Sequence, residues 1–187
     1  MKIICIGDSL TYGYGVWQSK CWVTLLSEAT GIRALNHGIN GDTSGYMLER
    51  SRRHVIPDKA DPGDIVIVMG GANDVLMYGA NENDASNIIM IAELALAKNC
   101  KPVIGIQPGF KPSDYPFYGP LDPAALNEDF NRFAELVREG AKARGIAIFD
   151  LRPVLEDASL FNDGVHPTDE GHRLIADTVL DTIKPLL

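Results

Sequence analysis

Ser9, near the start of the chain, and the pair Asp163 and His166, near its end, are of the types that together perform acyl transfer. Ser9 follows directly on the apolar run Lys2–Ile6, and a hydroxyl on the turn after a strand is well placed to act as a nucleophile. Asp163 and His166 are three positions apart. At this spacing the carboxylate can accept the Nδ1 proton, which leaves Nε2 free to take a proton from Ser9. We therefore expect Ser9, His166 and Asp163 to be catalytic residues.

Two further residues are candidates for stabilising a developing oxyanion. Gly41 lies in a turn, and a glycine lets a backbone N–H approach a substrate oxygen with no Cβ in the way. Asn73 follows an apolar run, and a side-chain amide there could lower a reaction barrier by roughly 3–4 kcal/mol. Each residue also has an ordinary explanation, Gly41 as a turn glycine and Asn73 in an Asx turn. The residues alone leave both explanations open.

The other histidines and acidic residues near these motifs have simpler expected roles. His37, His54 and His172 have no carboxylate partner at short spacing, so we expect them to be structural or solvated. Asp42 and Asp74 are expected to stabilise turns rather than to react. Ser9 itself could be a helix cap and His166 a surface residue, so each motif is weak when it is taken alone.

Composition and charge exclude several classes of function. The chain has 187 residues, which fits one domain spanning residues 1–187, and 45% of the residues are hydrophobic. Its net charge of -8 argues against binding to nucleic acid or to an anionic membrane surface. Cys5, Cys21 and Cys100 have no metal-binding spacing and form no even disulfide set. We expect no metal and no cofactor, and a small molecule rather than a macromolecule as the partner; the sequence does not set the oligomeric state.

No apolar segment is long enough to predict a membrane span. The first expected strand begins at Lys2, which leaves no room for a signal peptide before it and favours a cytoplasmic protein. Secretion stays possible if a signal peptide has been removed.

Apolar runs alternate with amphipathic stretches along the chain, a pattern that predicts a parallel sheet covered by helices on both faces. The expected fold class is therefore α/β, with a central sheet of five parallel strands in a three-layer α/β/α arrangement. The expected strands are Lys2–Ile6, Ile32–Asn36, Asp64–Met69, Pro102–Gln107 and Ile146–Asp150. The expected helices are Trp17–Thr30, Ser44–His54, Asp84–Asn99 capped by Asp84, Pro123–Arg144 capped by Asp122, and Thr168–Ile183.

One connection, Pro108–Asp122, is longer than usual and rich in proline, glycine and aromatic residues, which predicts a loop or lid on the substrate side. Aromatic and apolar residues in this loop and after the strands could line a substrate cleft, although we expect at least half of them to pack on one another. These residues are Tyr12, Tyr14, Trp17, Tyr46, Leu76, Met77, Tyr78, Phe110, Tyr115, Phe117 and Tyr118. From this set, the residues expected to bind substrate are Tyr12, Tyr46, Leu76, Tyr78 and Phe110.

Taken in order, these motifs resemble those of the GDSL or SGNH hydrolase family of esterases and lipases. The matching segments span essentially the whole chain: residues 7–11 (Gly-Asp-Ser-Leu-Thr), residues 36–43 with Gly41-Asp-Thr, residues 71–74 (Gly-Ala-Asn-Asp) and residues 163–167 (Asp-Gly-Val-His-Pro). The resemblance implies a flavodoxin-like fold and a serine esterase that works through an acyl-enzyme. Substrates in such a family range from aryl and alkyl esters to thioesters, lysophospholipids and acetylated sugars.

The resemblance also assigns roles to single residues. It implies that Ser9 is the nucleophile, that His166 is the base and that Asp163 orients His166. It places the Ser9 N–H, the Gly41 N–H and the Asn73 side chain in an oxyanion hole. Short-to-medium acyl or aryl esters are the substrates we favour, because an apolar cleft suits such groups.

Two other functions stay open from the sequence. A carbohydrate O-deacetylase of the same fold would use the same chemistry, since aromatic residues also stack on sugar rings. A flavodoxin-like module that binds phosphate or a nucleotide without catalysis is the alternative from another class. The chain lacks a P-loop motif, and Gly13-Tyr-Gly15 is followed by no third glycine at the dinucleotide spacing. That alternative also leaves the Asp163–His166 pair without a role.

Overall fold

The structure, a computed structural model, describes residues 1–112 and 122–187. Five parallel strands form one sheet: β1 (Ile3–Gly7), β2 (Ala34–Gly38), β3 (Ile65–Met69), β4 (Lys101–Ile106) and β5 (Ala147–Asp150). Their order is β2-β1-β3-β4-β5. The apolar runs therefore predicted the strands to within a residue or two at each end, and the parallel arrangement is confirmed.

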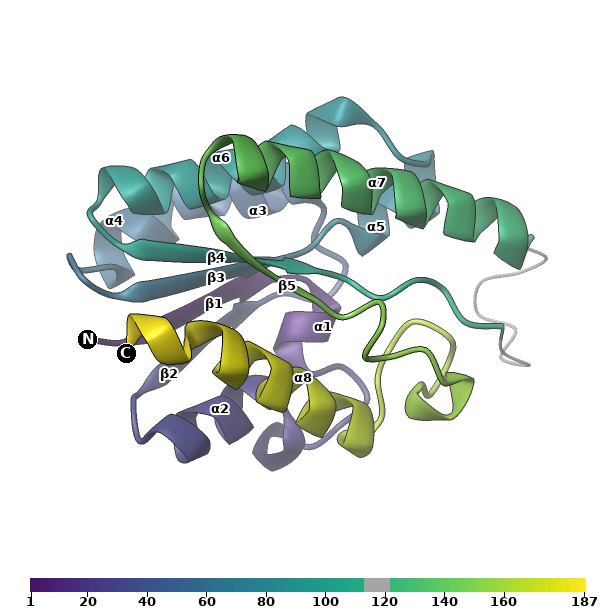
Figure 1. Ribbon diagram of the computed structural model, residues 1–187, viewed down its shortest axis with the longest axis horizontal. Coiled ribbons are helices and arrows are strands. Elements are labelled where there is room, and N and C mark those ends of the chain that lie inside the picture. Colours follow the sequence, from purple (N-terminus) through teal and green to yellow (C-terminus); the bar gives the residue numbers. More distant parts are fainter. Residues whose placement is uncertain (113–121) are drawn as a thin grey trace.

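Helices cover both faces of the sheet, as Figure 1 shows. One face carries α3 (Ser44–Arg50), α4 (Ile56–Lys59), α5 (Ala72–Tyr78), α6 (Glu82–Ala97) and α7 (Pro123–Ala143). The other face carries α1 (Ser9–Tyr12), α2 (Trp22–Thr30) and α8 (Asp169–Ile183). A π-helical segment, Ser51–Val55, joins α3 to α4, and 3₁₀ turns occupy Gln18–Lys20, Ala158–Leu160 and Lys184–Leu186.

Two of the predicted helix starts were wrong. Helix α6 begins at Glu82, and its cap is Asn81, whose side chain accepts the N–H of Asp84 at 3.0 Å. Asp84 therefore lies in the first turn, where its charge still suits the helix dipole. The helix expected from Trp17 starts only at Trp22, because a 3₁₀ turn over Gln18–Lys20 and an extended Cys21 come first.

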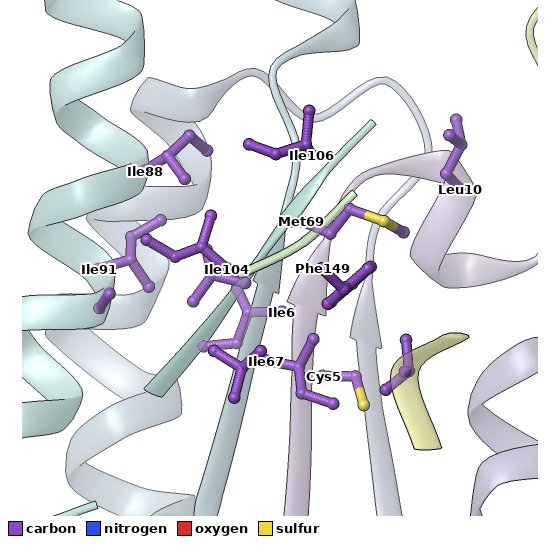
Figure 2. Close-up of a cluster of buried hydrophobic side chains, with 14 of the residues drawn as sticks. Cys5, Ile6, Leu10, Ile67, Met69, Ile88, Ile91, Ile104, Ile106 and Phe149 are labelled. Atoms are coloured by element: carbon purple, nitrogen blue, oxygen red, sulfur yellow. The ribbon is translucent and has the colours of Figure 1, made fainter. Parts of the chain in front are cut away.

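The hydrophobic core lies on both faces of the central strands. Every residue of β1 and β3 is buried, as expected for strands covered by helices on both sides. Figure 2 shows Ile88 and Ile91 of α6 beside Ile104 of β4, while Met69 and Phe149 lie nearer to α1. All three cysteines are buried and free, so they behave as small apolar residues.

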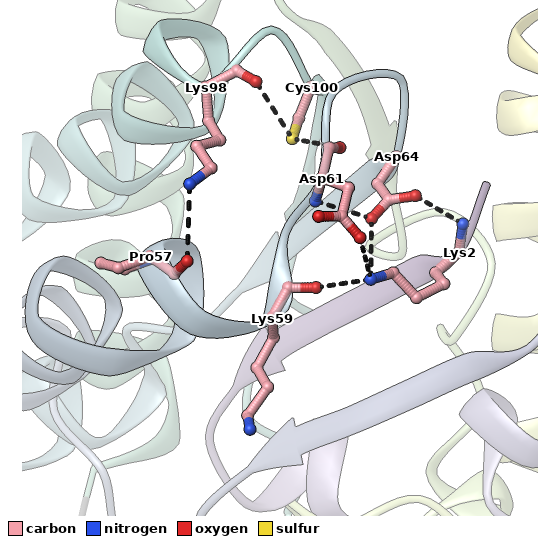
Figure 3. Close-up of polar contacts among 7 residues, drawn as sticks. All are labelled: Lys2, Pro57, Lys59, Asp61, Asp64, Lys98 and Cys100. Atoms are coloured by element: carbon pink, nitrogen blue, oxygen red, sulfur yellow. Dashed lines mark hydrogen bonds and ion pairs between the residues drawn. The ribbon is translucent and has the colours of Figure 1, made fainter.

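Ion pairs fasten the amino ends of the central strands (Figure 3). The Lys2 side chain donates to the Lys59 carbonyl at 2.9 Å and to Asp61 at 2.7 Å. Asp64, which is buried, accepts the backbone N–H of Lys2 at 2.7 Å. These contacts hold the beginnings of β1 and β3 together and leave the carboxyl ends of the strands to carry the site.

The strand order identifies where a ligand should bind. The chain passes from β1 to β2 at one side and then crosses to β3 on the other side of β1. In open parallel sheets, ligands bind at the carboxyl ends of the strands beside such a reversal. Ser9 follows β1 and Asn73 follows β3, so both residues lie at this position.

Candidate active site

Ser9 is placed by the tight turn that joins β1 to α1. Strand β1 ends at Gly7, and the Asp8 side chain caps α1 by accepting the Leu10 N–H at 3.0 Å. Ser9 is the first residue of the helix, where a backbone N–H has no partner within the helix. Gly38 lies next to α1, and a Cβ there would come within 2.1 Å of the Tyr12 nitrogen. A glycine at position 38 thus lets the helix, and Ser9 with it, sit against the sheet.

His166 meets Ser9 although 157 positions separate them. Its Nε2 lies 2.9 Å from Ser9 Oγ, and its Nδ1 lies 2.6 Å from a carboxylate oxygen of Asp163. The second oxygen of Asp163 accepts the backbone N–H groups of Val165 and His166 at 3.0 and 2.8 Å. Asp163 is therefore held as an acceptor, and this favours the tautomer in which Nε2 can accept the Ser9 proton.

The surroundings keep Asp163 ionised and His166 in place. Burial opposes the charge on Asp163, but the hydrogen bonds from the His166 ring and from two backbone N–H groups outweigh it and lower its pKa. The ring of Tyr14 lies against the imidazole of His166, with centroids 4.5 Å apart and planes inclined by 47°. His172 is not part of this group of residues. It is buried, which lowers its pKa to about 4, and its Nδ1 accepts the backbone N–H of Trp22.

The candidate oxyanion donors Gly41 and Asn73 lie on two segments that contact each other. Gly41 has a φ of 77° and is exposed. Asn73 lies in the first turn of α5, and its amide nitrogen donates to the Asp42 carbonyl at 2.8 Å. This hydrogen bond joins Asn73 to the loop that carries Gly41 and Asp42. An amide nitrogen carries two N–H groups, so one remains for a substrate oxygen.

The two acidic neighbours of these donors stabilise the loops, as expected. Asp42 binds the Arg50 side chain at 2.6 Å. Asp74 accepts the backbone N–H and the hydroxyl of Ser44 at 2.9 and 2.8 Å, and burial raises its pKa. The carboxylate of Asp74 thus lies at the N-terminus of α3, where its negative charge is also favourable to the dipole of that helix.

Comparison with known proteins identifies the family. The profile of the GDSL-like lipase/acylhydrolase family matches residues 5–174. The chain belongs to this family. It is thus a serine esterase, that is, a carboxylic ester hydrolase, and the resemblance seen in its motifs is confirmed.

Individual relatives agree with this assignment. The chain is 30% identical to esterase TesA of Pseudomonas aeruginosa, over 99% of this chain and 89% of the relative. It is 26% identical to an arylesterase of Vibrio mimicus, over 95% of this chain and 86% of that protein. The crystal structure of a G-D-S-L family lipolytic protein from Veillonella parvula superposes with a TM-score of 0.81 at 26% identity, covering 97% of both chains.

Three polar residues around the site of this GDSL family member were given no role from the sequence, although one of them, Asp8, belongs to the Gly-Asp-Ser-Leu motif. Asp8, which directly precedes Ser9, is fully buried, and burial raises its pKa to about 6 against the hydrogen bonds from Gln107 and Leu10. Arg50 contacts the loops of Gly7 and Asp42. Gln107 directly follows the apolar strand β4, and a polar side chain at this position was the signal that could have identified it.

The expected substrate-binding residues differ in exposure. Tyr12, Tyr46 and Tyr78 are exposed, the last two at 71% and 74%. Leu76 is only partly exposed and packs on the core. Phe110 is 7% exposed and packs in the hydrophobic core, and its binding of substrate stays a prediction. The aromatic residues Tyr115, Phe117 and Tyr118 of the expected lid lie outside the described residues.

Within residues 1–112 and 122–187, no group of three or more His, Cys, Asp or Glu residues could hold a metal ion. No helix in these same ranges has the length and apolar character that crossing a membrane requires.

Proposed function

We propose that Ser9, His166 and Asp163 carry out a two-step acyl transfer to water. The observation that carries this proposal is the continuous contact from Ser9 Oγ to His166 Nε2 at 2.9 Å and from His166 Nδ1 to Asp163 at 2.6 Å. This geometry gives a nucleophile, a base within proton-transfer reach and a carboxylate that stabilises the imidazolium.

In the first step Ser9 Oγ attacks the ester carbonyl carbon while His166 takes its proton. The negative charge on the carbonyl oxygen is accepted by the N–H groups of Ser9 and Gly41 and by the Asn73 amide. The C–O bond to the alcohol then breaks, and the alcohol leaves with the proton from His166. Water, activated by the same base, hydrolyses the acyl-enzyme in the second step.

The substrates we propose are short-to-medium acyl or aryl esters. Exposed aromatic side chains after β1, β2 and β3, namely Tyr14, Tyr46 and Tyr78, offer apolar surface to such groups. The arylesterase among the relatives supports the aryl part of this proposal. Thioesters and lysophospholipids present the same acyl carbonyl to Ser9, so we propose them as further substrates.

An ester panel with matched serine variants tests the proposal. Turnover of p-nitrophenyl acetate, butyrate and octanoate should fall by orders of magnitude in Ser9→Ala and stay unchanged in Ser19→Ala, since Ser19 is exposed on the 3₁₀ turn. A fluorophosphonate should label the wild type at Ser9 only. Undiminished turnover by pure, folded Ser9→Ala would refute the assignment.

The same experiment separates the alternatives. Faster reaction with acetylated xylo-oligosaccharides than with p-nitrophenyl esters would identify a sugar deacetylase. No labelling and no turnover, together with binding of phosphate or nucleotide, would identify a non-catalytic module.

A further inference from the structure

Arg50 is bound to two loops that carry proposed oxyanion donors. It is the last residue of α3, and its side chain is mostly buried, with 16% exposed. Its Nη2 donates to the Gly7 carbonyl at 2.9 Å, and its Nε donates to the Asp42 carboxylate at 2.6 Å. Gly7 lies two residues before Ser9, and Asp42 directly follows Gly41. One side chain therefore connects the nucleophile turn with the loop of Gly41.

The connection extends to the third donor through the backbone of Asp42. While the carboxylate of this residue binds Arg50, its carbonyl accepts the side-chain N–H of Asn73 at 2.8 Å. A shift of Asp42 would therefore move the acceptor that orients Asn73. The planar guanidinium fixes the directions of its N–H groups, so it holds Gly7 and Asp42 at a set separation.

The burial of this pair distinguishes it from an ordinary surface ion pair. The side chain of Asp42 is 10% exposed, so water screens its contact with Arg50 only weakly. Arg53 of the adjoining π-helical segment forms a pair with Glu49, but these side chains are 69% and 49% exposed. Surface pairs of that kind contribute little. The winding also changes from α to π directly after Arg50, and π-helical turns are often found at functional sites.

We infer that Arg50 is a positioning residue of the oxyanion hole, which it holds together by fixing Gly7 and Asp42, and through Asp42 also Asn73. This inference rests on the proposed function of Ser9, Gly41 and Asn73. Arg50 itself donates to protein oxygens, and its effect reaches the substrate through Asn73 and the two backbone N–H groups. Since these donors act mainly on the transition state, loss of Arg50 should reduce kcat more than it raises KM.

A double-mutant cycle with Asn73 tests the inference. The variants are Arg50→Met, Asn73→Ala, the two combined, and Arg53→Met as the matched control on the surface pair. Rates on p-nitrophenyl butyrate are normalised to the fraction of sites that a fluorophosphonate titrates, and thermal unfolding of each variant is recorded. We expect Arg50→Met to lower kcat by about 10- to 100-fold with KM changed by less than about threefold, and Arg53→Met to leave both constants unchanged.

The effect of Arg50→Met in the Asn73→Ala variant shows whether Arg50 acts through Asn73. Arg50→Met should lower kcat by a smaller factor when Asn73 is already alanine, because only the part of its effect that reaches the substrate through the Ser9 and Gly41 N–H groups is then left to lose. Equal losses in both backgrounds, or an unchanged kcat in Arg50→Met, would overturn the inference. If Arg50→Met does not fold, Arg50→Lys takes its place in the cycle under the same criterion, because lysine keeps the charge but not the two-directional donor geometry.

Turnover by Ser9→Ala distinguishes failure of the proposed function from failure of the inference about Arg50. Full turnover by Ser9→Ala overturns the proposed function, and the role of Arg50 with it. Loss of turnover in Ser9→Ala together with additive effects of Arg50 and Asn73 overturns the role of Arg50 alone.

Discussion

Gln107 donates a hydrogen bond of 2.8 Å to the buried carboxylate of Asp8, which lies 99 positions earlier in the chain. The other end of the same amide, its Oε1, accepts the N–H of Ala72 at 2.8 Å. Asp8 precedes Ser9, and Ala72 precedes Asn73. One buried amide therefore joins the turn of the nucleophile to the turn of Asn73. Arg50 in the same way joins the turn of the nucleophile to the loop of Gly41.

The buried position of Asp8 predicts a specific dependence of stability on pH. Burial raises its pKa from 3.8 to about 6, so the folded protein keeps a proton that the unfolded chain releases between about pH 4 and pH 6. The contribution of Asp8 to the free energy of unfolding therefore falls as pH rises through this window, by about 3 kcal/mol, and is constant above it.

Chemical denaturation of the wild type and of Asp8→Asn between pH 4 and pH 8 checks this prediction. The stability of the wild type minus that of the variant should decrease from pH 4 to pH 6 and then level off. Groups common to both proteins cancel in this difference, including Asp163, whose lowered pKa acts in the opposite direction. A difference that is flat over the whole range would show that Asp8 has an ordinary pKa.

The contacts of Asp163 predict that its charge, and not only its shape, is needed. Both of its oxygens act as acceptors, toward two backbone N–H groups and toward the His166 ring. Asparagine at this position must turn an N–H₂ group toward one of these donors, which favours the wrong tautomer of His166. We expect Asp163→Asn to lower kcat on p-nitrophenyl butyrate by about 10³- to 10⁴-fold.

The control for this variant is Asp169→Asn, because Asp169 is an exposed residue at the start of α8. The control should keep wild-type rates. Activity of Asp163→Asn within tenfold of the wild type would instead mean that Asp163 does not orient the base.

Asn73 provides a test of transition-state binding. Its free N–H should meet the oxygen only when negative charge develops there, so Asn73→Ala should lower kcat by about 10²- to 10³-fold and raise KM far less. Asn83→Ala, an exposed substitution on α6, serves as the control in the same steady-state measurements. The opposite pattern, a raised KM with kcat retained, would make Asn73 a substrate-binding residue.

Local sequence patterns predicted the sheet well because they are strong where the chain is buried. The run Ile65–Met69 is apolar at every position and ends at two glycines, and it forms β3. Helix starts were harder to predict, since they depend on which polar side chain reaches a backbone N–H. Both Asn81 and Asp84 can act as caps, and the structure uses Asn81.

The residues that hold the site in place were the part that sequence could not provide. Ser9, Asp163 and His166 stand out because their types and spacing match a known chemistry. Arg50 is one of three arginines within four positions, and only the fold shows that it alone of these turns toward Gly7 and Asp42. Long-range packing also buries Phe110 in the core, which the composition of its segment does not reveal.

A comparison of Gly41→Ala with Gly31→Ala separates the effect of backbone strain on stability from an effect on catalysis. The φ of 77° at Gly41 disfavours any residue with a Cβ, although a Cβ there would meet no atom of the described residues within 4 Å. Gly31, at the end of α2, has a φ of 67° and equally open surroundings. Alanine at either position should therefore lower the free energy of unfolding by about 1–2 kcal/mol. Only Gly41→Ala should also lower kcat, because its methyl group and altered backbone disturb the N–H offered to the substrate oxygen. Denaturation and steady-state kinetics of the two variants check this, and equal kcat values in both would exclude Gly41 from the oxyanion hole.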